Sequence, residues 1–376
     1  MPRKGENIYK RKDGRWEGRY IKGHTPAQKA IYGYVYAHSY KETKNKLNLA
    51  ISHSDQGSCV KLPGTTFSEL AEQWLKSQKT RVKESTYNKY HNILCSYVLP
   101  YIGTINTKGL SLESISHLCD TLLSNGGKQG TGLSAKTVAD TLSVIRSVMQ
   151  YSLNMGYSYA FDVRSIHMRQ QNHELRVLSN SEQNILYTYL CTNLSLCNIG
   201  ILICLLTGLR IGEVCALCWE DISFSDHTIY VHQTMQRIQD KSGSGKKTKI
   251  VITPPKSISG QRLIPMPESL ERILLRLHSD RIGFVLSADG VDPTEPRVLQ
   301  YHFNKILKDL DIEQVNFHVL RHTFATRCVE VGFDVKSLSE ILGHSSVAIT
   351  MNKYVHPSMD LKHKNMQRLS SLFAVK

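Results

Sequence analysis

The chain has 376 residues, 41% of them hydrophobic and 21% charged, which is the composition of a folded globular protein of two or three domains. Its longest apolar run, residues 199–206, falls far short of the roughly 20 residues that cross a bilayer, and its basic start lacks the apolar segment of a secretory signal. The formal net charge of +15 predicts a polyanionic partner, which we expect to be nucleic acid and not a membrane surface.

The nine cysteines are scattered along the chain and suggest no disulfide framework. This usage favours a reducing compartment such as the cytoplasm. The single CxxC pair, Cys215 and Cys218, lies in an apolar helical pattern without a second ligand pair. We therefore interpret it as packed small side chains and not as a zinc site.

Residues 1–60 are predicted to form a small β-rich module with a basic surface. Asp13-Gly14 is a hairpin-turn signal, residues 31–36 are a further strand, and a polar helix is expected over residues 41–50. Twelve lysines and arginines against five acidic residues give this module a net charge of +7. Because the positive charge is clustered, we favour DNA binding by this module. The alternative is a basic hairpin that faces only water and buries its tryptophan in a small core. The candidate contacts are Lys10, Arg11, Lys12, Arg15, Trp16 and Arg19.

After a linker over residues 52–66, the hydrophobic period becomes that of helices. Thr66, with Glu69 three residues later, has the signature of a capping box at the first helix start. The predicted helices cover residues 67–75, residues 87–98 and residues 138–153. The second of them is expected to stop near Pro100. Together they predict an all-helical domain over residues 64–165.

A third domain is predicted over residues 172–376, with a C-terminal tail. It begins with a capped helix and a buried helix over residues 199–206. The strands that we predict next are residues 227–236, residues 249–253 and residues 262–265. Helical patterns return from about Pro296.

Six residues of this third domain have side chains suited to phosphodiester chemistry. Two arginines bind phosphate oxygens in pairs, while histidines and a lysine donate hydrogen bonds or move protons. A tyrosine serves as the nucleophile, and nearby positive charge is expected to lower its pKa. Glu213, three residues after the first arginine, is expected to orient a basic group. The six candidates are Arg210, Lys256, His318, Arg321, His344 and Tyr354.

Metal-dependent chemistry is not favoured by the sequence. His318 and His322 have the i, i+4 spacing of zinc-binding helices, but the accompanying glutamate is missing and Arg321 between them would repel a cation. No acidic cluster resembles a two-metal nuclease site. We therefore expect neither a metal nor another cofactor.

In the order Arg, Lys, His-x-x-Arg, His, Tyr, the six candidates resemble the catalytic set of the tyrosine recombinases, or phage-integrase family. The resemblance covers residues 175–360 and includes the segment ALCWEDIS that follows Arg210. Lys256 is preferred over three nearby lysines because it lies a few residues before the strand-like QRLIP. The resemblance implies the family's fold, with a mainly α catalytic domain that contains a small β-sheet.

The other two domains have counterparts in the same family. The helical domain resembles its core-binding domain. The basic N-terminal module resembles the arm-binding domain of integrases from conjugative transposons and temperate phages. The resemblance therefore implies a bacterial site-specific recombinase that integrates and excises a mobile element.

The resemblance also implies a mechanism. Tyr354 attacks a DNA phosphodiester, which forms a 3′-phosphotyrosine and releases a 5′-hydroxyl. Arg210 and Arg321 stabilise the phosphorane, Lys256 protonates the leaving oxygen, and His318 assists the tyrosine as a base. The linkage keeps the energy of the bond, so that religation needs neither ATP nor metal.

The resemblance also implies the partners of the protein. The first is DNA, whose phosphate is expected to accept a hydrogen bond from His344. Four identical protomers act on two duplexes at core and arm sites and pass through a Holliday junction, with an excisionase and DNA-bending proteins as further partners. The tail over residues 357–376 is expected to dock either on a neighbouring protomer or on its own domain.

Three other functions are compatible with part of this sequence pattern. A type IB topoisomerase uses the same chemistry but reseals a single duplex, and the basic N-terminal module favours recombination. A DNA-binding regulator with an inactive catalytic domain is disfavoured by the intact catalytic set. A metal-dependent nuclease would require EDTA-sensitive cleavage.

Overall fold

The computed structural model describes most of the chain. The described residues are 7–11, 13–24, 30–54, 65–127, 130–157, 159, 161–168, 176–240, 247–255, 257–278, 281–355, 363, 366 and 367. The chain divides into two compact units, Met1–Gln171 and Asn172–Lys376. None of the helices in the described ranges is long and apolar enough to cross a membrane.

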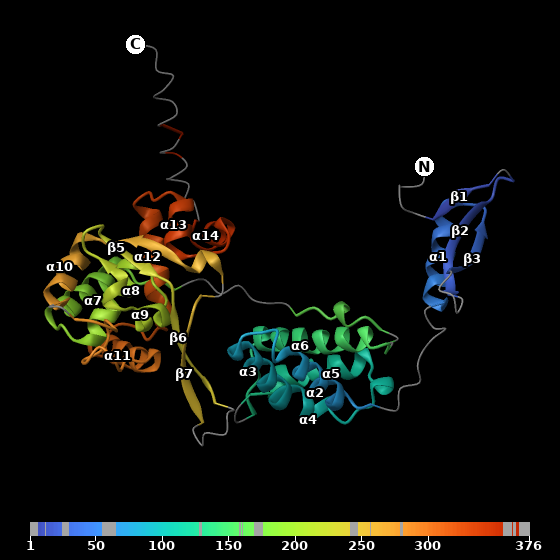
Figure 1. The fold of residues 1–376 in the computed structure, drawn as a ribbon, viewed down its shortest axis with the longest axis horizontal. Helices are drawn as coiled ribbons and strands as arrows, with labels where there is room; N and C mark the ends of the chain where they lie inside the picture. Colours follow the sequence, from blue (N-terminus) through green and yellow to red (C-terminus); the bar gives the residue numbers. More distant parts are fainter. Residues whose placement is uncertain are drawn as a thin grey trace, which may run out of the picture. The chain divides into compact units, whose positions relative to one another are not determined.

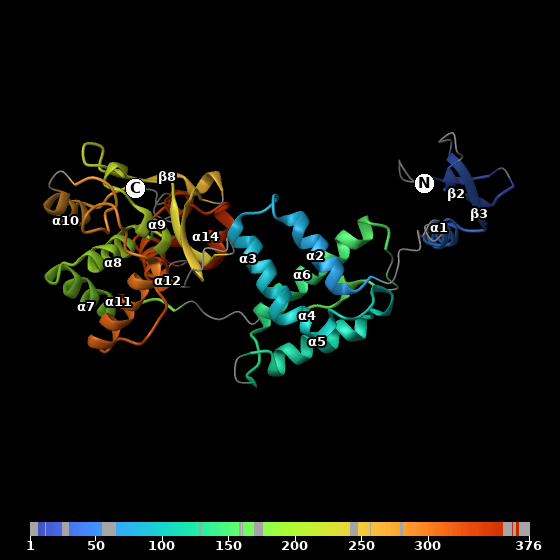
Figure 2. The ribbon, with the colours of Figure 1, turned by 60° about the horizontal axis from the view of Figure 1, so that its bottom comes forward.

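The N-terminal module is an antiparallel three-stranded sheet with one helix. The sheet has the order β1-β2-β3, and Figure 2 shows helix α1 lying beside it. Its elements are β1 (Ile8–Lys10), β2 (Trp16–His24), β3 (Ala30–Ala37) and α1 (Tyr40–Ser54). Gly14 has a φ of 84° in the first turn, a conformation that glycine adopts without strain. The predicted hairpin, strand and helix are confirmed.

One face of this sheet is covered by α1 and the other is open. A Cβ on Gly18 would meet Val35, Thr43 and Leu47 within 3.3 Å, so that this face packs tightly on the helix. Side chains alternate along a strand, so the residues between these point away from the helix. The open face includes Tyr34 of β3, of which 49% is exposed.

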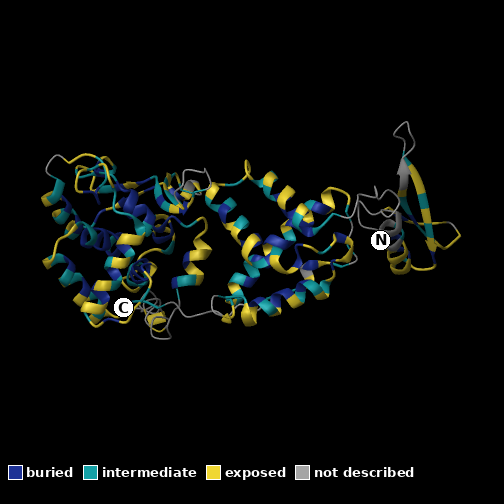
Figure 3. Cartoon of the chain, turned by 90° about the horizontal axis from the view of Figure 1, so that it is seen from below, coloured by how far each residue is buried: buried dark blue, intermediate teal, exposed yellow. Residues whose placement is uncertain are grey.

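The helical domain packs its helices around one apolar core. Figure 3 shows their buried sides turned toward one another. The helices are α2 (Phe67–Gln78), α3 (Glu84–Ile93), α4 (Leu99–Ile102), α5 (Leu112–Asn125) and α6 (Ala135–Asn154). The predicted capping box is confirmed, since the Thr66 hydroxyl accepts from the Glu69 N–H and the Glu69 carboxylate accepts from the Thr66 N–H.

The second helical path ends near Pro100, as predicted, although the proline itself lies inside its last segment. A π-helical turn over Leu94–Val98 joins α3 to α4, and Pro100 stands in the first turn of α4. Proline is tolerated there because the N–H groups of a first turn have no partner within their own helix. The helical path therefore continues to Ile102.

The second unit, Asn172–Lys376, surrounds one buried helix, α8. Its helices are α7 (Asn180–Thr192), α8 (Leu196–Thr207), α9 (Ile211–Ala216), α10 (Glu268–His278), α11 (Pro296–Asp309), α12 (His318–Glu330), α13 (Val335–Leu342) and α14 (Val347–Tyr354). α8 packs against α7, α11 and α12. Most residues of α8 are buried, which explains why its sequence is apolar on all sides.

Two small sheets complete this unit. One has the order β4-β5-β8, and the other is the hairpin of β6 and β7, which projects from the helices in Figure 1. The strands are β4 (Ile222–Ser223), β5 (Thr228–Val231), β6 (Thr234–Gln239), β7 (Thr248–Thr253) and β8 (Arg262–Pro265).

Two predictions for this unit were wrong. The single strand over residues 227–236 is two strands of different sheets. The chain turns where His232 bonds Asp221 and the Gln233 amide donates to the Ala216 carbonyl. Helices also return earlier than residue 296, because α10 uses apolar residues at helical spacing, with Leu270 and Leu274 buried.

Candidate active site

Arg210 stands at the junction of the buried helix α8 and the short helix α9. Gly208 ends α8 with a φ of 68°, and a Cβ there would lie 2.5 Å from the Phe324 ring. The chain therefore turns sharply and Arg210 becomes the cap of α9. Its Nη1 donates to Glu213 Oε1 at 2.7 Å, while its side chain remains 38% exposed. Arg210 is thus oriented by Glu213 and still open to a ligand.

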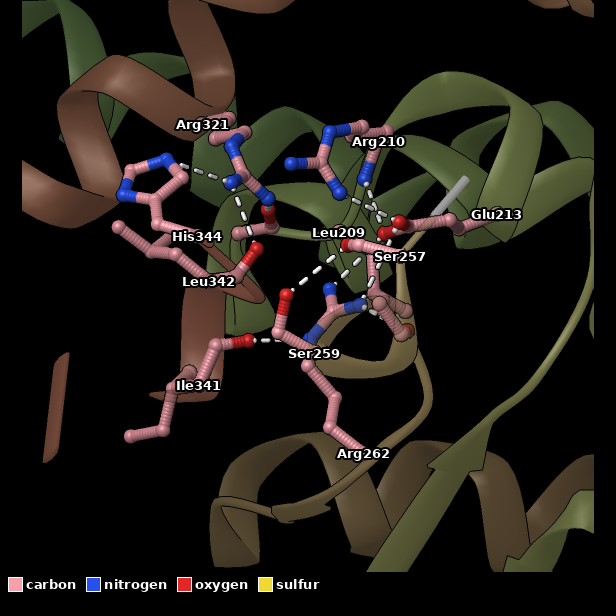
Figure 4. Close-up of polar contacts among 12 residues, drawn as sticks. Leu209, Arg210, Glu213, Ser257, Ser259, Arg262, Arg321, Ile341, Leu342 and His344 are labelled. Atoms are coloured by element: carbon pink, nitrogen blue, oxygen red, sulfur yellow. Dashed lines mark hydrogen bonds and ion pairs between the residues drawn. The ribbon is translucent and has the colours of Figure 1, made fainter. Parts of the chain in front are cut away.

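Arg321 is held almost completely inside the protein on α12. Its guanidinium donates to the carbonyls of Gly208, at 2.8 Å, and Leu342, at 2.7 Å, and to His344 Nε2 at 3.0 Å (Figure 4). Burial, followed by repulsion from Arg210, lowers the pKa of Arg321 to about 10. Arg321 therefore remains positively charged at neutral pH.

His344 follows the left-handed residue Gly343 that ends α13. Burial and the charge of Arg321 lower the pKa of His344 to about 4, so the imidazole is neutral at pH 7. Its Nε2 accepts from Arg321, because arginine is a donor only. The proton then lies on Nδ1, which donates to the Thr350 hydroxyl at 2.8 Å.

Tyr354 is the last residue of α14 and is 5% exposed. Its ring stacks parallel to that of His344, with 6.3 Å between ring centroids. Burial raises the pKa of Tyr354, although Arg321 and Arg210 oppose this shift. The predicted lowering of its pKa is therefore wrong for the protein without DNA, because desolvation outweighs the attraction of the two arginines.

The hydroxyl of Tyr354 contacts His322 and not His318. The distance from Tyr354 Oη to His322 Nδ1 is 2.8 Å, while the His318 ring lies edge-on to His322 at 4.7 Å between centroids. Burial is the main cause that lowers the pKa of His318 to about 4 and that of His322 to about 3. Both imidazoles are neutral at pH 7. The sequence interpretation considered His322 only as a zinc ligand and missed this contact.

A second residue that the sequence interpretation missed is Arg262 in β8. It forms a buried ion pair with Glu213, whose carboxylate it shares with Arg210. Burial opposes ionisation of Glu213, but the hydrogen bond and charge of Arg262 outweigh it, so that the pKa of Glu213 is lowered. The alternation of β8, which buries Arg262 and Ile264, is the signal that would have singled it out.

Lys256 lies outside the described residues, in the connection between β7 and β8. The C-terminal tail also lies outside them, apart from residues 363, 366 and 367. Among the described residues, no group of three histidine, cysteine or acidic side chains is arranged to hold a metal ion.

The candidate DNA contacts of the N-terminal module are only partly on its open face. Trp16 packs edge-on against Tyr40 of α1, at 5.3 Å between centroids, so this partly buried side chain lies on the helix side of the sheet and not on its open face. Arg19 lies on the open face, with its guanidinium 4.6 Å from the centre of the Tyr32 ring. Strand alternation forces this separation, because residues 16 and 19 point to opposite faces.

The remaining candidates surround the first hairpin turn. Arg11 pairs with Glu17 and Arg15 with Asp13, and both arginines are about half exposed. Lys10 Nζ lies 6.0 Å from the centre of the Trp16 ring. Lys12 lies outside the described residues.

The chain matches two family descriptions in sequence. Residues 176–360 match the phage integrase family, and residues 66–118 match the N-terminal SAM-like domain of phage integrases. A XerC-like tyrosine recombinase of Caldanaerobacter subterraneus subsp. tengcongensis is 24% identical over 375 residues, which is 92% of this chain and 93% of the relative. The transposase of transposon Tn916 from Enterococcus faecalis is 29% identical over 191 residues, 45% of this chain and 44% of the relative.

Solved structures share the fold. The integrase of transposon Tn1549, in complex with transposon right end DNA, has a TM-score of 0.68 at 21% identity, over 81% of this chain and 100% of that one. A lambda integrase tetramer bound to a Holliday junction has a TM-score of 0.57 at 16% identity, over 94% of this chain and 98% of that one.

The fold and the cluster of arginines, histidines and a tyrosine define an enzyme that breaks and rejoins DNA. The chain belongs to the phage integrase family and is a tyrosine recombinase.

Proposed function

We propose that the protein cuts and rejoins DNA through a 3′-phosphotyrosine on Tyr354, and so integrates and excises a mobile element. The observation that supports this most is the position of the Tyr354 hydroxyl, 2.8 Å from a neutral histidine and beside two arginines. A phosphate held by those arginines would meet the phenol directly. The similarity to transposon integrases supports the mobile element as the substrate.

The proposed reaction begins when Tyr354 Oη attacks the phosphorus and passes its proton to His322 Nδ1. The phosphorus–5′-oxygen bond then breaks, and the leaving oxygen takes a proton from Lys256. Arg210 and Arg321 stabilise the charge of the phosphorane, and His318 donates to one of its oxygens. When Arg321 turns from His344 Nε2 to the phosphate, His344 can take the Nε2–H form and also donate to the phosphate, while its Nδ1 accepts from the Thr350 hydroxyl. His322 replaces His318 as the proposed base because His322 Nδ1 lies 2.8 Å from the phenol oxygen, whereas the His318 ring stands behind His322. A His322→Gln variant that cleaved DNA as fast as the wild type would exclude this role.

The proposed assembly is a homotetramer on two duplexes in the bacterial cytoplasm. The tetramer of lambda integrase on a Holliday junction supports this assembly. We assign arm binding to residues 1–60, core binding to residues 64–165, and catalysis to residues 172–376. An excisionase and DNA-bending proteins are the further partners that we propose.

A two-site assay tests recombination against the topoisomerase alternative. Two plasmids, each with the attachment site mapped beside the gene, are incubated with the protein, and recombinant junctions are measured by amplification across them. We expect junctions without ATP and in the presence of EDTA. Relaxation of one supercoiled plasmid without any junction would instead assign the protein to the nicking-closing class. Loss of cleavage in EDTA would favour a metal-dependent nuclease.

Arg19 is expected to contribute to arm binding. It lies on the open face among exposed tyrosines, and its Nε is one of two buried side-chain polar atoms without a hydrogen-bond partner among the described residues. Arg19→Ala should weaken binding to arm duplexes about tenfold. It should also reduce the slope of the logarithm of the binding constant against the logarithm of the salt concentration by about one, as loss of a phosphate contact does.

The control for this prediction is Lys46→Ala, which removes one positive charge from α1 on the other side of the sheet. Fluorescence anisotropy at several salt concentrations measures both variants on arm and core duplexes. Equal losses for the two variants would show that only net charge matters, and the open face would then not be the arm-binding surface.

A further inference from the structure

Arg262 joins three segments of the catalytic unit through one buried guanidinium. Its side chain is only 6% exposed. It donates to both oxygens of Glu213, at 2.9 and 3.3 Å, to the Gly260 carbonyl at 3.0 Å and to the Ile341 carbonyl at 2.5 Å. Figure 4 shows the guanidinium between Glu213 and the segment of Ile341. A planar group with several fixed donors holds these acceptors at set separations.

The first of these segments orients Arg210. The Glu213 carboxylate receives Arg262 on both of its oxygens and Arg210 on Oε1. Because Arg262 binds both oxygens, it fixes the plane of the carboxylate, and this plane determines where Arg210 points. One buried negative charge is thereby shared between a buried arginine and an exposed one.

The second segment is the turn that holds His344. The Ile341 carbonyl that binds Arg262 lies at the end of α13, and Gly343 closes this helix directly before His344. A Cβ on Gly343 would lie 2.9 Å from Arg262 Nη1 and 2.9 Å from the Ser259 carbonyl. The turn therefore packs directly on the guanidinium and has no room for a side chain.

We propose that Arg262 is a positioning residue for strand cleavage: it sets the separation of Arg210 and His344, and so shapes the phosphate site without touching DNA. This inference rests on the proposed transesterification. A phosphate must be bound at the correct geometry by both groups at once, and a displacement of about 1 Å can slow an enzyme about 100-fold. Arg262 then contributes to the rate of the chemical step and not to the affinity for DNA.

Arg262→Lys tests the inference with least risk to the fold, because lysine keeps the charge beside Glu213 but cannot reach all of the acceptors. The substrate is a nicked suicide duplex with the core site, on which cleavage traps the covalent adduct. We expect unchanged DNA affinity and a thermal midpoint within about 5 °C of the wild type. Adduct formation under single-turnover conditions should be at least about tenfold slower.

Arg327→Lys is the matched control. Arg327 also donates to a carboxylate, an amide and a backbone carbonyl, those of Glu330, Gln183 and Leu178. None of these three hydrogen bonds reaches an active-site residue that the structure describes. Its replacement should leave the rate of adduct formation unchanged. Should Arg262→Lys fail to fold, Glu213→Gln, which keeps the shape of the side chain, is expected to show the same slow cleavage at unchanged affinity.

A double-mutant cycle separates positioning from general damage. If Arg262 acts in part through Arg210, its replacement should cost much less in an Arg210→Lys background than in the wild type. The inference would be overturned if the double variant lost the product of the two single-variant reductions in the rate of adduct formation. A wild-type rate for Arg262→Lys would also overturn it. A wild-type protein that binds the duplex without forming any adduct would instead overturn the proposed function, so the two failures are distinguishable.

Discussion

Tyr354→Phe should bind the core duplex with wild-type affinity and form no covalent adduct. The substitution removes only the hydroxyl that we propose as the nucleophile. The ring, which is 5% exposed and stacks on His344, keeps its packing. The loss of one hydrogen bond to His322 should change the free energy of unfolding by only about 1 kcal/mol. A nicked suicide duplex, followed by denaturing gel electrophoresis, measures the adduct.

The control is Tyr301→Phe, which removes the hydroxyl of a tyrosine in the same unit that is 74% exposed. This variant should form adduct as the wild type does. An adduct with Tyr354→Phe would mean that another residue attacks the phosphate. Binding without adduct in the wild type would support the inactive regulator.

Arg321→Lys should lower the rate of cleavage about 100- to 1,000-fold, the loss typical of removing one preorganised donor from a charged transition state. Arg321 donates to two backbone carbonyls and to His344 at once. A lysine ammonium at this buried position cannot replace all three contacts and also bind a phosphate oxygen. We expect the thermal midpoint to fall as well, because the carbonyls of Gly208 and Leu342 would lose their partner.

The cleavage rate is measured on the same suicide duplex at saturating protein, so that weaker binding does not contribute. Arg327→Lys on the same helix controls for the loss of an arginine with three acceptors. If Arg321→Lys retained more than about a tenth of the wild-type rate, Arg321 would be a structural residue and not a phosphate ligand.

Local patterns were sufficient for most of the elements. The Thr66 capping box, the Asp13-Gly14 turn and the uniformly apolar helix α8 are signals within a few residues of one another, and all three are present in the structure. The predictions failed where a contact with a residue far away in the sequence determines the course of the backbone. β5 and β6 separate because Gln233 bonds a carbonyl at the end of α9, and no periodicity encodes that contact.

The same distinction between local signals and long-range contacts applies to the active site. Arg210, Arg321, His344 and Tyr354 are recognisable by type and order along the chain, and the structure brings them together. His322 was set aside because its spacing from His318 suggested only a metal site. Its contact with the phenol depends on the packing of α12 against α14.

The sequence alone determined the family and the basic charge, because both depend on the chemical identity of the residues. It also singled out Tyr354 as the nucleophile that we propose. The tertiary structure determined the protonation state and the contacts of each side chain, because these depend on burial and on the neighbouring groups. It raised the pKa of Tyr354 where nearby charge alone predicted the reverse, and it turned Trp16 toward α1. It also made Arg262 the link between Arg210 and His344, through contacts that span residues 213 to 341.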